Sequence, residues 1–290
     1  MNLRSKLYLA LAATTFSATA FGAGNYVPGV EGVQAASVPP PGIYYLAYLV
    51  NYNIDQISNV PGDNTGTVSV IANRLVWISN HKLFGANFGM GAIAPVQANS
   101  LTFNGIGYAG TSRGLGNLYL EPVILAWHGT NWDGVFALGR FLNSANYSST
   151  NPSSVGTGYG STMLTLGGTY YPDSKKEWSA SVLARFEKNS TQSQTGITPG
   201  DGLTVEWGIG RQIGGGKDVG LVGYYQDQTS SNSGPGANPL NPSKSGIGIQ
   251  FDYPILDHGV ILKFAGYTEY SARGGAAEGN LLRMTIVKAF

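Results

Sequence analysis

The chain has 290 residues, of which only 11% are charged, and a formal net charge of +1. Soluble domains usually carry about 25% charged residues, and a nearly neutral chain has no basic face with which to neutralise several phosphates, so a nucleic-acid partner is excluded. The absence of cysteine excludes disulfides and thiolate metal sites, and no apolar run of about 18 residues follows the extreme N-terminus, which excludes membrane-spanning helices there.

Residues 1–22 have the pattern of a secretory signal peptide. Arg4 and Lys6 precede an apolar stretch over residues 7–16, and Ala18-Thr19-Ala20 offers a small-residue cleavage site. An N-terminal membrane anchor is the alternative, but the apolar stretch is short for that role. We therefore expect export across the inner membrane.

Residues 23–42 form a segment that contains proline and glycine and shows no clear periodicity. The run Pro39-Pro40-Pro41 favours an extended polyproline conformation. Two interpretations stay open. The segment is a periplasmic leader into the first strand, or it enters the barrel described next as a plug, with Glu31 pairing an interior arginine such as Arg283 or Arg185.

Strand-like stretches separated by turn signals fill the rest of the chain. The pattern predicts about twelve strands, at residues 43–55, 67–80, 83–96, 116–128, 132–142, 159–171, 177–188, 202–213, 218–229, 245–256, 259–271 and 280–290. Short and long connections alternate between them. Bacterial single-chain barrels have an even number of antiparallel strands, short periplasmic turns and long outer loops. The sequence therefore predicts an all-β fold, a transmembrane antiparallel up-and-down β-barrel over residues 43–290.

Charged side chains within the strands keep mostly to one parity. Because successive side chains point to opposite faces, and an Arg or Lys facing lipid at mid-depth costs about 2–4 kcal/mol, we place the charged parity inside. The expected lumen- or channel-lining residues are Arg74, Glu121, Arg140, Arg185, Glu187, Glu206, Asp252, Lys263, Glu269 and Arg283. They either line a polar channel or form a network of ion pairs that braces a narrow barrel, since small barrels fill their interiors with side chains.

Aromatic residues lie where a barrel meets the membrane interfaces. Four tryptophans fall beside predicted short turns, namely Trp77, Trp127, Trp132 and Trp178. Tyr44, Tyr48 and Tyr52 alternate along the first strand, and we expect them to face lipid. The last strand ends at Phe290 after alternating apolar residues, a pattern that the barrel-assembly machinery recognises.

The sequence predicts no enzyme, no cofactor and no metal site. His81, His128 and His258 all fall at predicted short turns, without an evident nucleophile or carboxylate partner, and their spacing requires no metal. Gly105-x-Gly107-x-x-Gly110 matches a dinucleotide fingerprint in its letters only, because no helix follows it.

Four motifs resemble a family of outer-membrane proteins named for the meta-pathway of phenol degradation, which are transporter-like barrels. The motifs are Glu31-Gly32 with Ala35, Ser37 and Pro39-Pro40-Pro41-Gly42; Asn117-Leu118-Tyr119-Leu120-Glu121-Pro122 with Trp127-His128 and Trp132; Gly223-Tyr224-Tyr225-Gln226 with Gln228; and Glu278-Gly279. Members usually carry aspartate where this chain has Asn117, and residues 142–147 also differ from the family pattern. The resemblance implies a barrel that moves small hydrophobic or aromatic compounds.

The expected function is passive uptake of small hydrophobic or aromatic compounds through a channel in the bacterial outer membrane. Tyr108, Tyr147 and Tyr159 in the outer loops offer apolar contact with a polar handle. The alternative is a structural or adhesion barrel without selective transport. The expected partners are outer-membrane lipid, the barrel-assembly machinery and a small hydrophobic or aromatic ligand.

Overall fold

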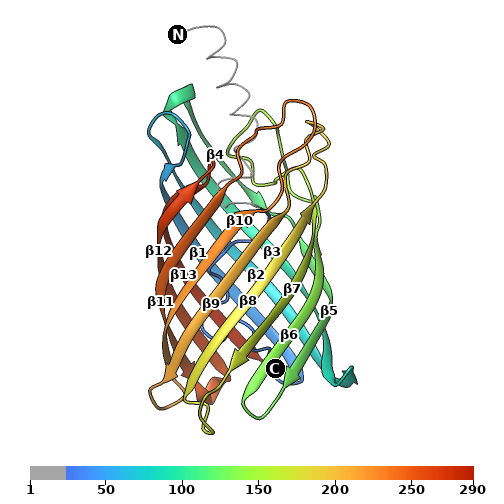
Figure 1. Cartoon of the computed structure of the whole chain (residues 1–290). Coiled ribbons are helices and arrows are strands. Elements are labelled where there is room, and N and C mark those ends of the chain that lie inside the picture. Colours follow the sequence, from blue (N-terminus) through green and yellow to red (C-terminus); the bar gives the residue numbers. More distant parts are fainter. Residues whose placement is uncertain (1–23) are drawn as a thin grey trace.

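A closed antiparallel β-barrel makes up most of the computed structural model, which describes residues 24–290 (Figure 1). The expected signal peptide over residues 1–22 lies outside the described residues. Within residues 24–290, no helix has the length and apolar character needed to cross a membrane.

The strands are β1 (Gly42–Ile57), β2 (Asn64–Leu83), β3 (Ala86–Phe103), β4 (Tyr108–Leu115), β5 (Tyr119–His128), β6 (Trp132–Phe141), β7 (Ser161–Tyr170), β8 (Trp178–Asn189), β9 (Gly202–Gln212), β10 (Asp218–Gln228), β11 (Ser243–Ile255), β12 (Val260–Arg273) and β13 (Ala277–Ala289). All twelve expected strands are present, and the largest difference in their bounds is at β3, which runs to Phe103 rather than to residue 96. Two short 3₁₀ turns, η2 (Asn104–Ile106) and η3 (Leu256–His258), complete the described elements.

Twelve of these strands form the ring, as expected. Each pairs antiparallel with the next along the ring, and β1 closes it by pairing with β13 over Tyr44–Ile57. The extra strand is β4, which the sequence analysis placed in a loop over residues 97–115. β3 pairs with β5 near one end and with β4 from Val96 to Phe103. No residue of β4 is buried, so no apolar face marks this strand in the sequence.

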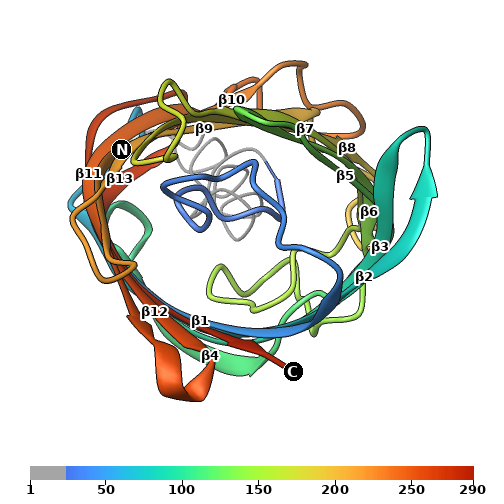
Figure 2. The ribbon, with the colours of Figure 1, turned by 90° about the horizontal axis from the view of Figure 1, so that it is seen from below.

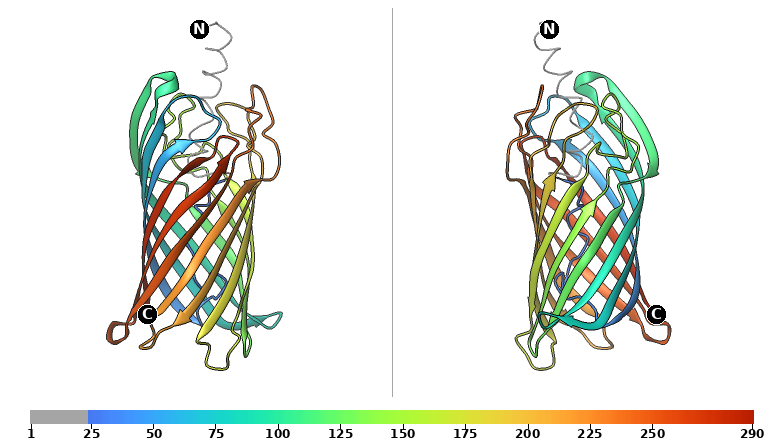
Figure 3. Two further views of the ribbon diagram at one scale, coloured as in Figure 1. Left: turned by 60° about the vertical axis from the view of Figure 1, so that its left-hand side comes forward. Right: turned by 90° about the vertical axis from the view of Figure 1, so that its right-hand side faces the viewer.

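The two ends of the barrel differ as the connection lengths predicted. The C-terminus lies at one end, here called the turn end, and most of the long connections lie at the other, the loop end (Figures 1 and 3). One connection corrects the expectation: residues 272–279 were predicted as a long loop, but β12 ends at Arg273 and β13 already begins at Ala277. Side chains alternate along the wall: in β8, Trp178 and Val182 are exposed outward, whereas Ser179 and Ser181 are buried inside. A closed ring of hydrogen-bonded strands with an apolar outer face is the structure of an outer-membrane β-barrel.

The tyrosines of β1 correct one expectation. Tyr48 and Tyr52 are 5% and 1% exposed and point into the barrel rather than to lipid. Ile43 and Leu49, on the opposite parity, are exposed outward. The reason is the phenolic hydroxyl, which needs a partner when it is buried: the Tyr52 hydroxyl donates to Glu269 Oε2 at 2.6 Å.

The chain before β1 runs inside the ring. Figure 2 shows residues 24–41, in blue, inside the ring of strands, and we call them the lumen segment. Asn25 Nδ2 donates to Ser161 Oγ at the loop end of the wall, whereas Ser37 Oγ lies 2.9 Å from the Tyr171 hydroxyl at the turn end. Val33 and Ala36 are buried between these points. The segment therefore crosses the lumen along most of its length.

Candidate functional site

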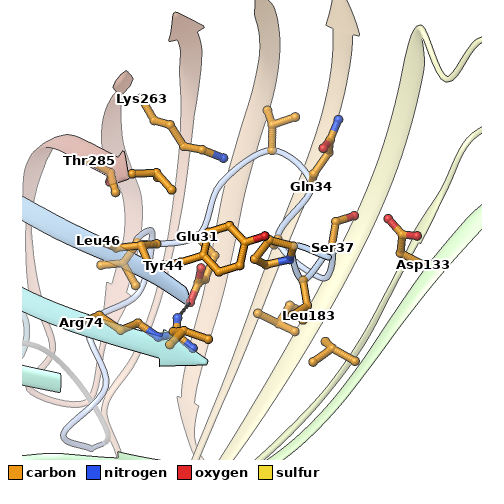
Figure 4. A pocket seen from close by; sticks show the side chains of 18 of the residues that line it. Glu31, Gln34, Ser37, Tyr44, Leu46, Arg74, Asp133, Leu183, Lys263 and Thr285 are labelled. Carbon is orange, nitrogen blue, oxygen red and sulfur yellow. Dashed lines mark hydrogen bonds and ion pairs between the residues drawn. The ribbon is translucent and has the colours of Figure 1, made fainter. Parts of the chain in front are cut away.

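Glu31 of the lumen segment meets two arginines of the barrel wall (Figure 4). Its Oε1 lies 2.7 Å from Arg185 Nη2 on β8 and 3.4 Å from Arg74 Nη1 on β2. Arg74 also binds Glu121 of β5, with 2.8 Å between Arg74 Nη2 and Glu121 Oε2. Charged groups removed from water need such partners. The cluster holds the segment to β2 and β8, and Arg74 extends it to β5.

Tyr26 adds a second contact to Arg185. The guanidinium carbon lies 4.3 Å from the centroid of the Tyr26 ring, a cation–π arrangement. Arg185 also donates to the Tyr26 hydroxyl, and that hydroxyl donates to Glu206 Oε1 on β9. Arg185 Nη1 itself lies 3.7 Å from Glu206 Oε1. Glu206 further accepts the backbone N–H of Glu31 at 3.1 Å.

Arg283 of β13 holds the backbone of the segment. It donates to the Val30 carbonyl and to Gln250 Oε1, which in turn accepts the N–H of Val33 at 3.3 Å. Gly32, between the two held residues, has a φ of +75°, and a Cβ at this position would lie 1.7 Å from Gln250 Oε1. Only glycine permits this approach.

Glu187 binds the start of the described chain. Its carboxylate accepts the backbone N–H groups of Asn25 at 3.1 Å and Tyr26 at 2.8 Å, and the Ser161 hydroxyl at 2.5 Å. The side chain is buried on β8. Backbone donors thus satisfy a carboxylate that has no ion-pair partner within residues 24–290.

A chain of hydrogen bonds ties the segment to the turn end. The Tyr171 hydroxyl donates to Asp133 Oδ2 at 2.6 Å, so Ser37 Oγ must donate to the tyrosine oxygen. Burial and the bond to Asp133 raise the pKa of Tyr171 well above its ordinary value, which keeps it protonated and able to donate. Asp133 Oδ1 lies 3.1 Å from His128 Nδ1. His128 therefore has a carboxylate partner that the sequence analysis did not find, because Asp133 follows it across a turn.

A second buried cluster lies where the barrel closes. Lys244 Nζ of β11 is 2.9 Å from Glu269 Oε1 of β12, and these side chains are 2% and 0% exposed. Glu269 also accepts the hydroxyls of Tyr52 and Tyr224 at 2.6 and 2.7 Å, and the Gly279 N–H at 2.8 Å. One carboxylate thus joins β1, β10, β11, β12 and β13. Lys244 was not among the expected lumen residues, because it falls between the expected strands at residues 218–229 and 245–256.

The other expected lumen residues separate into two cases. Asp252 and Lys263 point inward and lie 3.3 Å apart, Oδ2 to Nζ. Arg140 corrects the expectation: it is exposed on the outer parity of β6, next to Leu138, and its Nη1 donates to Thr162 Oγ1 at 2.9 Å. It stands one residue from the loop end of the strand at Phe141, where a long side chain can reach polar surroundings.

The loop tyrosines also differ from the expectation of open ligand contacts. Tyr159 is buried, and the Tyr108 hydroxyl lies 2.7 Å from Asn151 Oδ1 and 2.9 Å from Ser153 Oγ. Tyr108 thus joins β4 to the loop between β6 and β7.

Two cavities flank the Glu31 cluster. The one toward the turn end has a volume of about 480 Å³, and Ser37, Asp133 and Lys263 are among its lining residues. The one toward the loop end is about 130 Å³ and mostly apolar, with Val70, Ile93, Phe141 and Met163 in its wall.

Glu31, Arg74 and Arg185 line both cavities. The cluster therefore forms the boundary between the two spaces. No group of three side chains suited to hold a metal ion occurs within residues 24–290.

Comparisons with known proteins give the same architecture. The model of the family described as "Putative MetA-pathway of phenol degradation" matches residues 51–284. The COG4313 outer membrane channel from Pseudomonas putida F1 superposes with a TM-score of 0.76 at 14% identity, covering 91% of this chain and 100% of that one.

Two autotransporter barrels are more distant. The transport unit of AIDA-I from Escherichia coli has a TM-score of 0.53 at 9% identity, with 98% of each chain covered. The beta domain of the Bordetella autotransporter BrkA has a TM-score of 0.51 at 16% identity, covering 87% of this chain and 100% of that one. These structural likenesses show the barrel fold. No curated protein matches the chain by sequence.

Proposed function

The chain belongs to the family described as the putative MetA-pathway of phenol degradation, and from this premise we propose that it is an outer-membrane channel for passive uptake of small hydrophobic or aromatic compounds. In this proposal the lumen segment restricts the channel and moves aside during transport. The resemblance on which the sequence analysis relied is confirmed by the family match over residues 51–284.

The observation that carries the proposal is the apolar cavity toward the loop end. Its volume of about 130 Å³ and its valine, isoleucine, phenylalanine and methionine lining suit one aromatic ring, since an engineered apolar cavity of about 150 Å³ binds benzene. Polar groups at one side of an apolar pocket commonly orient a ligand, and here Asn117 and Arg74 supply them.

A structural barrel without selective transport is the second candidate. The observation in its favour is the dense network across the lumen, in which Arg74, Arg185 and Arg283 all bind the lumen segment. Such a network braces a small barrel. The two candidates differ in flux, because a bracing network without a pathway passes no solute selectively.

Swelling of proteoliposomes in a solution of phenylalanine or of glucose separates the two candidates, because the swelling rate reports how fast each solute enters. A channel with an aromatic-sized cavity passes phenylalanine faster than glucose, whereas a structural barrel shows no preference. Ala72→Phe places a ring in the loop-end cavity, which Ala72 lines, and we expect it to abolish the preference. Ile71→Phe, on the lipid face of the same strand, is the matched control and should behave as the unaltered protein. Equal flux of both solutes through the unaltered protein contradicts the proposed function.

A further inference from the structure

We propose that the Glu31 carboxylate occupies the place of a substrate carboxylate, so that a small aromatic monocarboxylate exchanges with Glu31 on Arg74 and Arg185 and releases the lumen segment. The inference rests on the proposed function, because it names the substrate class of that channel. In this inference, binding of the ligand is what opens the path through the barrel.

The first observation concerns the charge of the lumen segment. Glu31 is the only charged residue in residues 24–41, and a single oxygen, Oε1, receives both guanidinium groups. The Glu31 side chain is 18% exposed, against 3% for Glu121 on the same arginine. Of the two acids that bind Arg74, Glu31 of the lumen segment is thus the more accessible.

The second observation is unused donor capacity at the same place. The Nε–H groups of Arg74, Arg185 and Arg283 are buried, and none has a hydrogen-bond partner within residues 24–290. Buried donors without acceptors are costly. Arginine binds carboxylates best through two parallel hydrogen bonds, and a free ligand can adopt that geometry more readily than a side chain fixed to a backbone held at Val30 and Val33.

The third observation is access. Arg74 and Arg185 line both cavities, whereas Arg283 lines only the turn-end cavity, and the loop-end cavity is mostly apolar apart from a few polar groups. An aromatic ring in that cavity would direct its carboxylate to Arg74 and Arg185, which lie at its boundary. Figure 4 shows Arg74 and Glu31 facing one another beside the turn-end cavity.

The contacts that Glu31 makes explain why the ligand should be an anion. Once Glu31 leaves, Glu121 and Glu206 stay beside Arg74 and Arg185, and Glu187 still interacts with Arg185, but the carboxylate oxygen that both guanidinium groups shared is gone. A ligand carboxylate replaces that oxygen and its charge, whereas a neutral compound replaces no charge. A ligand shifts the position of the segment only if it binds the released state better, and a carboxylate that competes with Glu31 satisfies this condition.

Single-channel recording of the full-length protein at constant ionic strength tests the inference. Sodium benzoate should raise the open probability, while benzyl alcohol of nearly the same size should leave it unchanged, and acetate, which lacks the ring, should act more weakly. Glu31→Gln should raise the open probability without ligand by about tenfold, the factor expected from losing one charge-assisted hydrogen bond. This variant should also lose the benzoate response.

Two variants control for nonspecific effects. Glu177→Gln makes the same change at an exposed turn residue and should respond as the unaltered protein does. Glu31→Asp keeps the charge and should retain the response. Openings of Glu31→Gln in the absence of ligand show that this variant forms a folded channel, so that its loss of the benzoate response does not come from misfolding.

The inference is overturned if benzoate leaves the open probability unchanged, if benzyl alcohol acts equally well, or if Glu31→Gln keeps the full benzoate response. Its failure differs from failure of the proposed function. Selective phenylalanine flux with no benzoate effect removes the exchange and keeps the channel, whereas benzoate-induced opening without selective aromatic flux removes the aromatic channel and keeps the exchange.

Discussion

Gly32 shows at the scale of one residue how closely the lumen segment fits the barrel wall. Its backbone has a φ of +75°, and a Cβ would meet both Gln250 and Arg283 within 3 Å. The side chains that surround it hold the neighbouring carbonyl and amide of the segment. A residue with a side chain at position 32 cannot keep these bonds without displacing the segment.

We expect Gly32→Ala to weaken the closed state and raise single-channel conductance. The left-handed backbone alone costs a non-glycine residue about 1–2 kcal/mol, and the contact with Gln250 adds to this. Gly107→Ala is the matched control, because Gly107 also has a positive φ but would meet nothing within 4 Å. Conductance that rises equally in both variants would show that the effect does not come from the lumen segment.

At the scale of strands, Glu269 connects the closing region of the barrel. Its carboxylate is fully buried and binds Lys244, Tyr52 and Tyr224 from three other strands. Glu269→Gln leaves the Lys244 ammonium buried without its counter-charge, and breaking a buried pair in this way costs about 3–5 kcal/mol. The barrel should therefore unfold at a lower temperature, as followed by its mobility on gels with and without heating.

The control for this prediction is the more exposed pair. Lys263 is 25% exposed beside Asp252, and Asp252 also accepts a hydrogen bond from Gln250 at 2.7 Å. Lys263→Gln should therefore cost less than Glu269→Gln, because water screens a partly exposed ion pair more than a buried one. Equal unfolding temperatures for Glu269→Gln and Lys263→Gln would contradict the role given to the buried cluster.

The strands of the wall could be predicted because lipid and lumen impose opposite demands on alternate residues. Where that contrast is weak, the prediction failed: β4 has no buried face, and β1 carries tyrosine, which suits either side. Arg140 was placed inside because charge alone decided its assignment, although its strand places Leu138 and Arg140 on one outer face. The parity of the apolar neighbours would have given the correct side.

Contacts across the lumen are less accessible to sequence reasoning. Arg185 was named beforehand as a partner for Glu31, and the structure pairs them at 2.7 Å. The bonds of Tyr26, Gln250 and Tyr171 to or around the segment were not foreseen. They depend on the path of a segment without periodicity, and no spacing rule relates that path to strands more than a hundred residues away.

In residues 24–290, a closed wall of strands surrounds the lumen segment, which side-chain contacts hold to the wall. Arg185, Arg283 and Glu187 hold its first half, and Ser37 holds its end near β1. The ring is continuous through β1 and β13, so the segment is the part that must move to open an axial path. The central claim is that its position controls conduction.

A reversible disulfide between Val33→Cys and Gly210→Cys tests that claim most directly. The Val33 Cβ lies 3.6 Å from the place of a Cβ at Gly210 on β9, within the range of about 3.5–4.5 Å that disulfides require, and the chain has no other cysteine. The measurement is single-channel conductance before and after a reductant, with Val33→Cys alone as control. We predict that the oxidised protein shows no openings at voltages where the unaltered protein opens, and that reduction restores them. Oxidised protein that conducts at the level of the unaltered protein would contradict the account.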